Sequence, residues 1–298
     1  MCTSTRHLSA PCSGGSDYAL AADAKLVIVT AGVRSRSDES RLQLLGRNVK
    51  VFERALNRSF TIFQTNATTP SSTCSCFQIF IRAEIIPSIT KHAPDAVILI
   101  VTNPVDIMTQ VAAHLAGLAP GRVLGSGTAL DSSRFRSLIS KKLKVATRSV
   151  HAYILGEHGD SSVPVWSQAC VGCTPIEQWV PGVGKPDGPA EWNDIHKQVT
   201  GAAYEVIKAK GYTNLAIGLS TAAIAKAILR DERCVLPVTV HATGKHGIEQ
   251  DVFLSLPAVI GAGGVHGIVN CKLEAHEAEA LRHSAATLHA TAETLNQL

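Results

Sequence analysis

Short apolar runs and longer amphipathic segments follow each other through the first half of the chain. The runs AKLVIVTAG (24–32) and DAVILIVTNP (95–104) are rich in β-branched residues and end at Gly32 and Pro104, which predicts strands buried on both faces. Apolar residues at helical spacing predict helices at residues 40–52, 105–117 and 131–143. This alternation is typical of a parallel α/β sheet, which binds ligands at the carboxyl ends of its strands.

The hydrophobic pattern changes after about residue 128. The run VHAYIL (150–155) predicts a strand that leads into GEHGDSS (156–162). Further helices are expected at about residues 191–210, at about residues 214–230 and from Glu274 onward. Before the last helix, CVLPVTVHA, DVFLSLPAVIG and VHGIVNC are separated by glycine-containing turns, which favours an antiparallel meander.

The two patterns predict two domains, an α/β domain over residues 1–127 and an α+β domain over residues 128–298. One segment does not fit the first of them. Residues 59–75, SFTIFQTNATTPSSTCS, hold nine Ser and Thr in 17 positions without a helical or strand period. Such a segment buries little apolar surface, so we expect a disordered insertion at about residues 53–83.

The composition is that of a globular protein. The chain has 298 residues, of which 45% are hydrophobic and 17% are charged, enough for one large or two ordinary domains. No apolar run reaches the roughly 18 to 20 residues of a membrane helix, and the N-terminal stretch lacks the apolar core of a secretory signal. We expect a cytoplasmic protein without a membrane partner.

Charge and cysteine content argue against a nucleic-acid-binding protein and against a disulfide-linked protein. The net charge of +4 comes from 28 basic and 24 acidic residues without a clustered basic stripe, so nucleic acid is not an expected partner. The eight cysteines are expected as free thiols. Cys170 and Cys173 form a C-x-x-C without a second pair or a histidine at ligand spacing, so we expect a strand and turn there rather than a metal site.

His158, Asp131 and Arg134 are the first candidates for chemistry. His158 follows a predicted strand, and histidine exchanges a proton near neutral pH; a structural histidine in a turn is the alternative. Asp131 in LDSSRFR begins a predicted helix, where it either caps the helix or orients a histidine. Arg134 lies one helical turn later on the same face, as a surface residue or as a cation that grips a substrate carboxylate.

Arg41 and Asn103 are further candidates. Arg41 lies in the polar segment VRSRSDESRL, which is either solvated surface or a loop that closes over substrate. Asn103 follows a predicted buried strand and precedes Pro104. Its amide therefore either contacts a ligand at the sheet edge or forms a turn.

Several long motifs carry a family resemblance. In chain order they are KLVIVTAG, ESRLQLLGRNV, IIPSITKHAPDAVILIVTNPVDIMT, RVLGSGTALDSSRFR, ILGEHGDSSVPVWS, HKQVTGAAYEVIKAKGYTNLAIGLS and DVFLSLPAVIG. Over about residues 16–56 and 84–298 the chain resembles the L-lactate dehydrogenases of the lactate/malate dehydrogenase superfamily. The resemblance implies an α/β fold, with a Rossmann-like parallel sheet followed by an α+β substrate domain.

The resemblance also implies roles for the candidate residues. His158 matches the family's proton donor and acceptor, and Asp131 matches the carboxylate that pairs with it. Arg134 matches the guanidinium that holds the substrate carboxylate, and Arg41 matches the loop arginine that polarises the reacting carbonyl. Asn103 matches a contact to both nicotinamide and substrate.

Further matches concern the substrate pocket and the cofactor. Thr213 in KGYTN matches a substrate-pocket threonine, although a helix cap is the alternative. Arg34 and the turn of Thr30, Ala31 and Gly32 match positions that contact the cofactor. The implied reaction is reversible hydride transfer between NAD and a small 2-hydroxy or 2-keto acid, L-lactate or pyruvate. The resemblance also implies a homo-oligomer, which is a tetramer in the family.

The sequence departs from the family at its start. A dinucleotide site of this kind normally has a strand, a G-x-G-x-x-G turn and a helix, and we find none of them before residue 24. GSGTAL (125–130) lacks the third glycine and GAGGVHG (261–267) has the wrong spacing, so both are expected to be structural turns. We expect a truncated sheet with an exposed apolar edge at residues 24–32, and weak cofactor binding.

Two alternatives stay open. The position after Arg34 is glutamine in lactate enzymes and arginine in malate enzymes, and here it is Ser35 followed by Arg36. A malate-type 2-hydroxy acid dehydrogenase is therefore the alternative substrate class. A catalytically silent paralogue that only associates with intact subunits is the alternative to an active enzyme.

Overall fold

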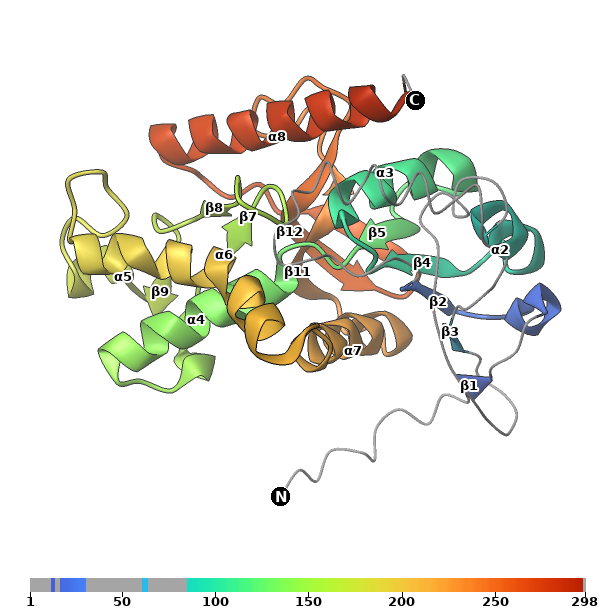
Figure 1. The fold of residues 1–298 in the computed structure, drawn as a ribbon, viewed down its shortest axis with the longest axis horizontal. Helices are drawn as coiled ribbons and strands as arrows, with labels where there is room; N and C mark the ends of the chain where they lie inside the picture. The colour runs from blue at the N-terminus through green and yellow to red at the C-terminus, as the bar shows by residue number, and fades with distance from the viewer. Residues whose placement is uncertain (1–11, 14–16, 31–60, 64–84, 297–298) are drawn as a thin grey trace. The chain divides into compact units, whose positions relative to one another are not determined.

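The computed structural model describes residues 12–13, 17–30, 61–63 and 85–296 of the chain (Figure 1). The chain divides into two compact units, each made of several stretches of sequence. Unit 1 comprises Met1–Gly125, Thr221–Cys234 and Val259–Gly267, and unit 2 comprises Ser126–Ser220, Val235–Ala258 and Ile268–Leu298. The residues outside the described ranges include the helix expected at 40–52 and Ala31, Gly32, Arg34, Ser35, Arg36 and Arg41.

Unit 1 contains a sheet with parallel strands. The parallel neighbours, in order, are β2 (Leu26–Val29), β4 (Val97–Ile100) and β5 (Val123–Gly125). Every residue of these strands is buried, as a nearly continuous run of Val, Ile and Leu predicts. α3 (Val105–Ala116) packs on β4 and β5, and α2 (Ile86–His92) lies beside α3 (Figure 1). The predicted α/β fold with a parallel sheet is confirmed.

An antiparallel strand covers the edge of β2. β3 (Thr61–Phe63) pairs with β2, with Val27 opposite Ile62, and β1 (Cys12–Ser13) pairs with β3. Two expectations are therefore wrong: that a disordered insertion occupies the whole of residues 59–75, and that β2 leaves its apolar edge open. Thr, Ile and Phe have high β propensity, and an open edge offers backbone groups that a short extended segment can satisfy. The other residues of the expected insertion lie outside the described part of the chain.

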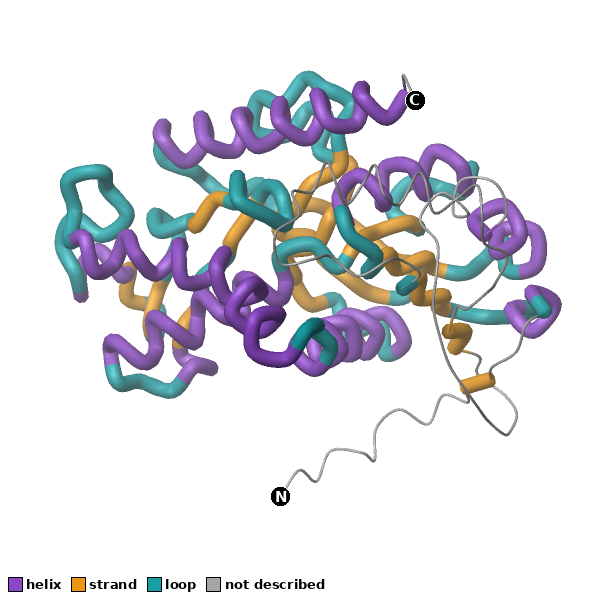
Figure 2. Tube along the Cα trace, viewed as in Figure 1, coloured by secondary structure: helices purple, strands orange, loops and turns teal. Residues whose placement is uncertain are grey.

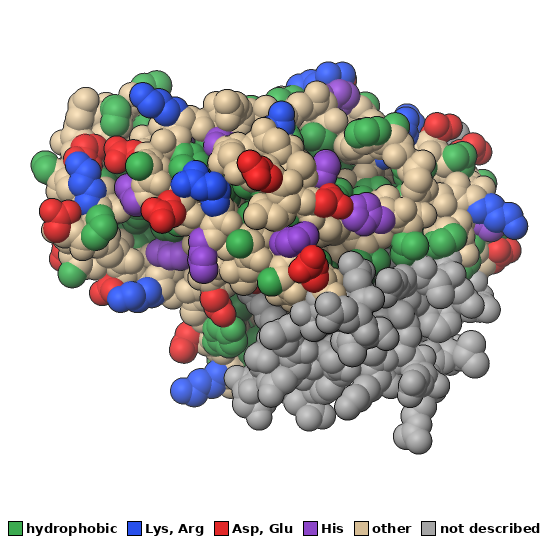
Figure 3. Space-filling model, turned by 90° about the horizontal axis from the view of Figure 1, so that it is seen from above, with side chains coloured by type: hydrophobic (Ala, Val, Ile, Leu, Met, Phe, Trp, Pro, Cys, Tyr) green, Lys and Arg blue, Asp and Glu red, His purple; other side chains and the backbone are tan. Residues whose placement is uncertain are grey.

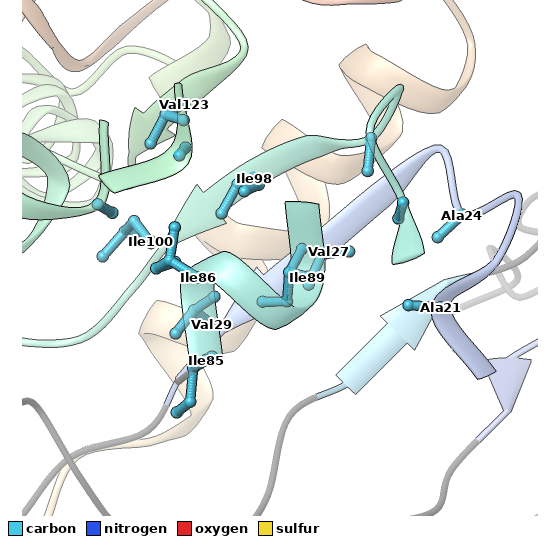
Figure 4. Packing of buried hydrophobic residues seen from close by; sticks show 14 of the residues in the cluster. Ala21, Ala24, Val27, Val29, Ile85, Ile86, Ile89, Ile98, Ile100 and Val123 are labelled. Carbon is cyan, nitrogen blue, oxygen red and sulfur yellow. The ribbon is translucent and has the colours of Figure 1, made fainter. Parts of the chain in front are cut away.

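The core of unit 1 joins the parallel strands to α2. Ile86 and Ile89 of α2 are fully buried, as are Val27 and Ile98 of the strands. Figure 4 shows these side chains in one cluster. Burial of each such branched side chain contributes about 1.5–3 kcal/mol relative to exposure. This packing fixes the strands whose carboxyl ends carry Thr30 and Asn103.

Unit 2 combines helices with short strands. Its helices include α4 (Ala129–Leu143), α5 (Ile176–Trp179), α6 (Ala190–Lys210) and α8 (Ala275–Asn296). Its strands include β6 (Val150–His151), β7 (Ile154–Leu155), β8 (Val163–Pro164), β9 (Cys170–Val171) and β10 (Thr174–Pro175). α4 lies beside α6 (Figure 2). Phe135 of α4 packs edge to face on Trp166, and Trp166 on Trp192 of α6, with ring centroids 4.6 and 6.2 Å apart.

The strand predicted at residues 150–155 is divided in two. In β6, His151 lies opposite Cys170 of β9, whereas in β7, Ile154 lies opposite Pro164 of β8. The two halves therefore belong to different sheets. A single apolar run does not reveal this division, because hydrophobicity alone does not select the pairing partner.

The apolar runs near the C-terminus form consecutive strands. The elements that contribute residues to both units are α7 (Leu215–Leu229), β11 (Cys234–His241), β12 (Phe253–Gly261) and β13 (Gly264–Ile268). β11, β12 and β13 are hydrogen-bonded neighbours in chain order. The two-residue connection between β12 and β13 joins antiparallel strands, because parallel strands need a much longer crossover.

Over the described residues, no helix combines the length and the apolar character needed to span a membrane. In the space-filling view of Figure 3, Lys and Arg side chains lie among Asp, Glu and His side chains. On the described residues of that face the charges are therefore mixed rather than gathered by sign.

Replacement of Ile98 by alanine tests the core of unit 1. Ile98 is 0% exposed, so Ile98→Ala leaves a cavity and should lower the free energy of unfolding by about 2–5 kcal/mol in urea titrations followed by circular dichroism. Lys91→Ala, on the exposed face of α2, is the control and should change it by at most about 0.5 kcal/mol. Equal effects of the two substitutions would contradict the burial of Ile98.

Candidate active site

Hydroxyl groups tie the beginning of α4 to β7. Ser132 Oγ accepts a hydrogen bond from the backbone N–H of Ile154 at 2.9 Å, and Thr128 Oγ1 donates to the carbonyl of the same residue. The helix begins at Ala129, two residues before its predicted start, so Asp131 lies within its first turn. Because bonds on both sides of Asp131 in sequence reach Ile154, its backbone is fixed relative to the end of β7.

β12 holds the same region through Ser255. Gly156 N–H donates to the carbonyl of Ser255 at 3.0 Å, and Ser255 N–H donates to the carbonyl of Gly156 at 2.9 Å. Ser255 Oγ accepts from the backbone N–H of Thr128 at 3.0 Å. A Cβ at Gly127 would lie 2.4 Å from Ser255 Oγ, so this glycine of GSGTAL is needed for close packing on β12.

Three of the predicted site residues meet beside this junction. His158 Nδ1 and Asp131 Oδ2 are 2.5 Å apart, and Arg134 Nη1 donates to Asp131 Oδ1 at 3.3 Å. The exposed fractions of the side chains are 22% for His158, 20% for Arg134 and 9% for Asp131. A carboxylate with so little access to water needs such partners to stay ionised.

The arrangement has the requirements of proton transfer. When Nδ1–H of His158 donates to Asp131, Nε2 is the ring nitrogen left to give or take a proton. The carboxylate attracts the protonated imidazolium ring and so stabilises it. Arg134 adds a guanidinium on the same helix, and a guanidinium binds the carboxylate of a small acid with two parallel hydrogen bonds.

His196 of α6 adjoins the site; it is the first residue of the motif HKQVTGAAYEV, but it was not among the predicted site residues. Its Nε2 lies 3.0 Å from Oγ of Ser162, which is four residues after His158. Burial lowers the pKa of His196 below its ordinary value of 6.5, and the negative charge of Asp131 opposes this effect. At pH 7 the ring is therefore neutral. A histidine within an amphipathic helix carries no sequence signal of the loop that it contacts.

Other predicted site residues lie elsewhere in the described part of the chain. Thr213 is exposed between α6 and α7. Thr30 and Asn103 belong to unit 1, where they are exposed just after β2 and β4. Because β2 and β4 are parallel, these two polar residues follow strand ends at the same edge of the sheet. Ala31, Gly32, Arg34 and Arg41 are outside the described residues.

The C-x-x-C motif lies in a hairpin. β9 and β10 pair with Val171 opposite Thr174, so Gly172 and Cys173 form the two-residue turn, and both have positive φ. Cys170 and Cys173 are free thiols. In the part of the chain that the structure describes, no group of three or more His, Cys, Asp or Glu side chains is placed to hold a metal ion.

Known proteins similar to this chain are dehydrogenases. Residues 3–67 and 77–125 match the lactate/malate dehydrogenase NAD binding domain, and residues 128–298 match the lactate/malate dehydrogenase alpha/beta C-terminal domain. The chain is 45% identical over 272 residues to an L-lactate dehydrogenase of Petromyzon marinus, an alignment that covers 91% of this chain and 72% of that relative. It is 44% identical over 274 residues to an L-lactate dehydrogenase A chain of Trachemys scripta elegans, covering 92% and 74%.

The lowered pKa of His196 predicts a dependence of stability on pH. Between that pKa and 6.5 the unfolded chain binds more protons at this residue than the folded chain, so the free energy of unfolding decreases as the pH falls through this window. His196→Gln should make this decrease smaller in urea titrations at several pH values between about 5 and 7. His246, whose pKa burial also lowers, retains its own contribution in both proteins.

The matched control is His283→Gln, at an exposed position of α8, which should leave the pH dependence as it is in the wild type. A His196→Gln variant whose stability falls as steeply with pH as that of the wild type would contradict the burial of a neutral ring.

Proposed function

The chain belongs to the lactate/malate dehydrogenase family, and we propose that His158, Asp131 and Arg134 carry out the substrate chemistry of its reaction. By family it is an NAD-dependent L-lactate dehydrogenase, an oxidoreductase. The proposal is supported mainly by the contacts among these three side chains. His158 Nδ1 lies 2.5 Å from Asp131 Oδ2, and Arg134 donates a hydrogen bond to the other oxygen of the same carboxylate.

The proposed role of His158 is to move the proton of the reacting oxygen. NAD, when bound, supplies the group that gives or takes the hydride at C2 of the substrate. In the direction of pyruvate reduction, His158 gives the proton on Nε2 to the carbonyl oxygen as C2 receives the hydride, and the product is L-lactate. In the reverse direction, neutral His158 takes the hydroxyl proton, and the carboxylate of Asp131 stabilises the resulting imidazolium.

Arg134 is proposed to bind the carboxylate of the substrate. It lies one turn after Asp131 on α4, and a guanidinium offers two parallel N–H donors to an acid. Arg41, outside the described residues, is proposed to polarise the carbonyl from its loop. A second cation there would stabilise the charge that develops on the carbonyl oxygen.

The residues of unit 1 fit a dinucleotide at the carboxyl ends of its strands. Thr30 and Asn103 are exposed after two parallel strands, the usual place for a ligand in such a sheet. We propose that they contact the cofactor together with Ala31, Gly32 and Arg34, and that Asn103 also contacts the substrate. Thr213 is proposed to line the substrate pocket.

Family membership is also the basis for proposing the location, the oligomeric state, the substrate and the domain limits. We propose a cytoplasmic homo-oligomer, a tetramer as in the family, acting on pyruvate and L-lactate in glycolysis. Residues 1–127 are proposed as the NAD-binding domain and residues 128–298 as the substrate domain. Lactate rather than malate is proposed because the relatives named above are L-lactate dehydrogenases.

Replacement of His158 tests the proton transfer. His158→Asn should lower kcat for pyruvate reduction by roughly a hundred- to ten-thousandfold, measured by the loss of NADH absorbance, because general acid catalysis contributes about that much. NADH affinity, from fluorescence titration, should stay nearly unchanged. The control is His283→Asn on the exposed surface of α8. Turnover retained in His158→Asn would remove this residue from the reaction.

Replacement of Arg134 tests substrate binding. Arg134→Lys keeps the positive charge but loses the paired donors, so KM for pyruvate should rise by roughly tenfold or more. Arg148→Lys, at an exposed position, is the matched control and should leave KM unchanged. The same KM in Arg134→Lys as in the wild type would refute a direct contact with the acid.

A further inference from the structure

The loop that carries His158 has hydrogen bonds that the reaction itself does not use. It runs from Gly156 to Ser162 between β7 and β8. Thr128 and Ser132 hold Asp131 in place, as described above, but they do not hold the loop beyond Gly156. The partner of Asp131 therefore needs supports of its own.

Ser284 of α8 supports the loop on one side. Its side chain is fully buried, and its Oγ accepts the backbone N–H of Glu157 at 2.8 Å. Ser161 Oγ donates to the carboxylate of Glu157 and lies 3.1 Å from Ser284 Oγ. Because the Ser161 hydroxyl donates its hydrogen to the Glu157 carboxylate, the Ser284 hydroxyl must be the donor in its bond with Ser161. These bonds join Glu157, Ser161 and Ser284 in a ring, and Glu157 and Ser161 lie on either side of His158 in the sequence.

The backbone at Gly156 lets α8 approach closely enough for this ring. A Cβ at Gly156 would lie 2.8 Å from Ser284 Oγ and 3.2 Å from Ser284 Cβ, and its φ is +83°. Only glycine adopts this conformation without strain and leaves room for the serine. The loop and α8 are therefore shaped for direct contact at Ser284.

α8 is itself fixed near its beginning. Glu277 is 2% exposed and accepts the backbone N–H of Ser167 at 3.0 Å and the hydroxyl of the same serine. Ser284 follows two helical turns later on α8. A helix fixed in this way is a rigid base for the loop.

A second support comes from α6. Ser162 is 7% exposed, and its Oγ lies 3.0 Å from His196 Nε2. The loop is thus bonded to α8 through Glu157 and Ser161 and to α6 through Ser162. In the sequence, His158 lies between Glu157, which is bonded to α8, and Ser162, which is bonded to α6.

We propose that Ser284 is a positioning residue for His158, holding the loop so that the imidazole ring stays in contact with Asp131, with His196 as the support at the other end. This inference rests on the proposed function of His158. Without the hydroxyl of Ser284, the backbone N–H of Glu157 loses this acceptor and the loop can shift. A catalytic group displaced by about 1 Å can cost a hundredfold in rate.

The test compares Ser284→Ala with the wild-type full chain by two measurements. Proton NMR detects the Nδ1–H of His158 in its hydrogen bond to Asp131, a downfield signal that is assigned by its absence in His158→Asn and needs neither cofactor nor substrate. Ser284→Ala should broaden or shift this signal. In steady-state pyruvate reduction, kcat should fall by roughly tenfold or more, while KM for pyruvate changes by less than about twofold because Arg134 lies on α4.

The matched control is Thr287→Ala, an exposed position of α8 whose hydroxyl donates to the carbonyl of His283 within the helix; it should leave the signal and kcat unchanged. An unchanged Nδ1–H signal in Ser284→Ala overturns the inference. If Ser284→Ala does not fold, Ser284→Cys, which replaces the hydroxyl with a much weaker acceptor of similar shape, should broaden or shift the same signal, and an unchanged signal overturns the inference. A wild-type chain without turnover would refute the proposed function alone, since the signal still reports on the position of the ring.

Discussion

The site depends on one short contact, the 2.5 Å between Asp131 Oδ2 and His158 Nδ1. Its two residues come from a helix and from a loop, so each must be held in place by other contacts. The surrounding bonds limit the movement of each partner. Thr128 and Ser132 attach α4 to β7, while Ser255 of β12 joins the start of α4 to Gly156. Ser284 then holds the loop that continues to His158.

The same contact stabilises the negative charge of Asp131. The side chain of Asp131 is 9% exposed, and an ionised carboxylate is costly in such a place unless hydrogen bonds and opposite charge surround it. Arg134 and His158 supply both. The two residues that stabilise the charge of Asp131 therefore have proposed roles in the reaction. Arg134 is proposed to bind the substrate carboxylate, and His158 to move the proton of the reacting oxygen. Burial lowers the pKa of the nearby His196, although the charge of Asp131 opposes this effect.

Long periodic segments and long motifs were the predictable part of this protein. α6 and α7 begin and end within about a residue of their predicted limits, because a helical period over many residues leaves few alternatives. β3 was missed, since three β-forming residues in a Ser/Thr-rich stretch gain a partner only through the fold. The pair of His158 and Asp131 was found through family motifs. The contacts of Ser284 and His196 with the loop were not predicted, because a serine or histidine inside a helix carries no sign of a contact with a distant loop. Ser284 bonds Glu157 across 127 positions.

In the proposed arrangement, Asp131 fixes the proton of a neutral His158 on Nδ1, and Nε2 faces the substrate. Long-range proton–nitrogen correlation spectra of the wild-type chain, recorded where His158 is neutral, distinguish the two ring tautomers directly. Nδ1 should carry the proton of the neutral ring, and Nε2 should carry none. A neutral ring protonated on Nε2 would contradict this arrangement, because Nδ1 could then donate nothing to the carboxylate.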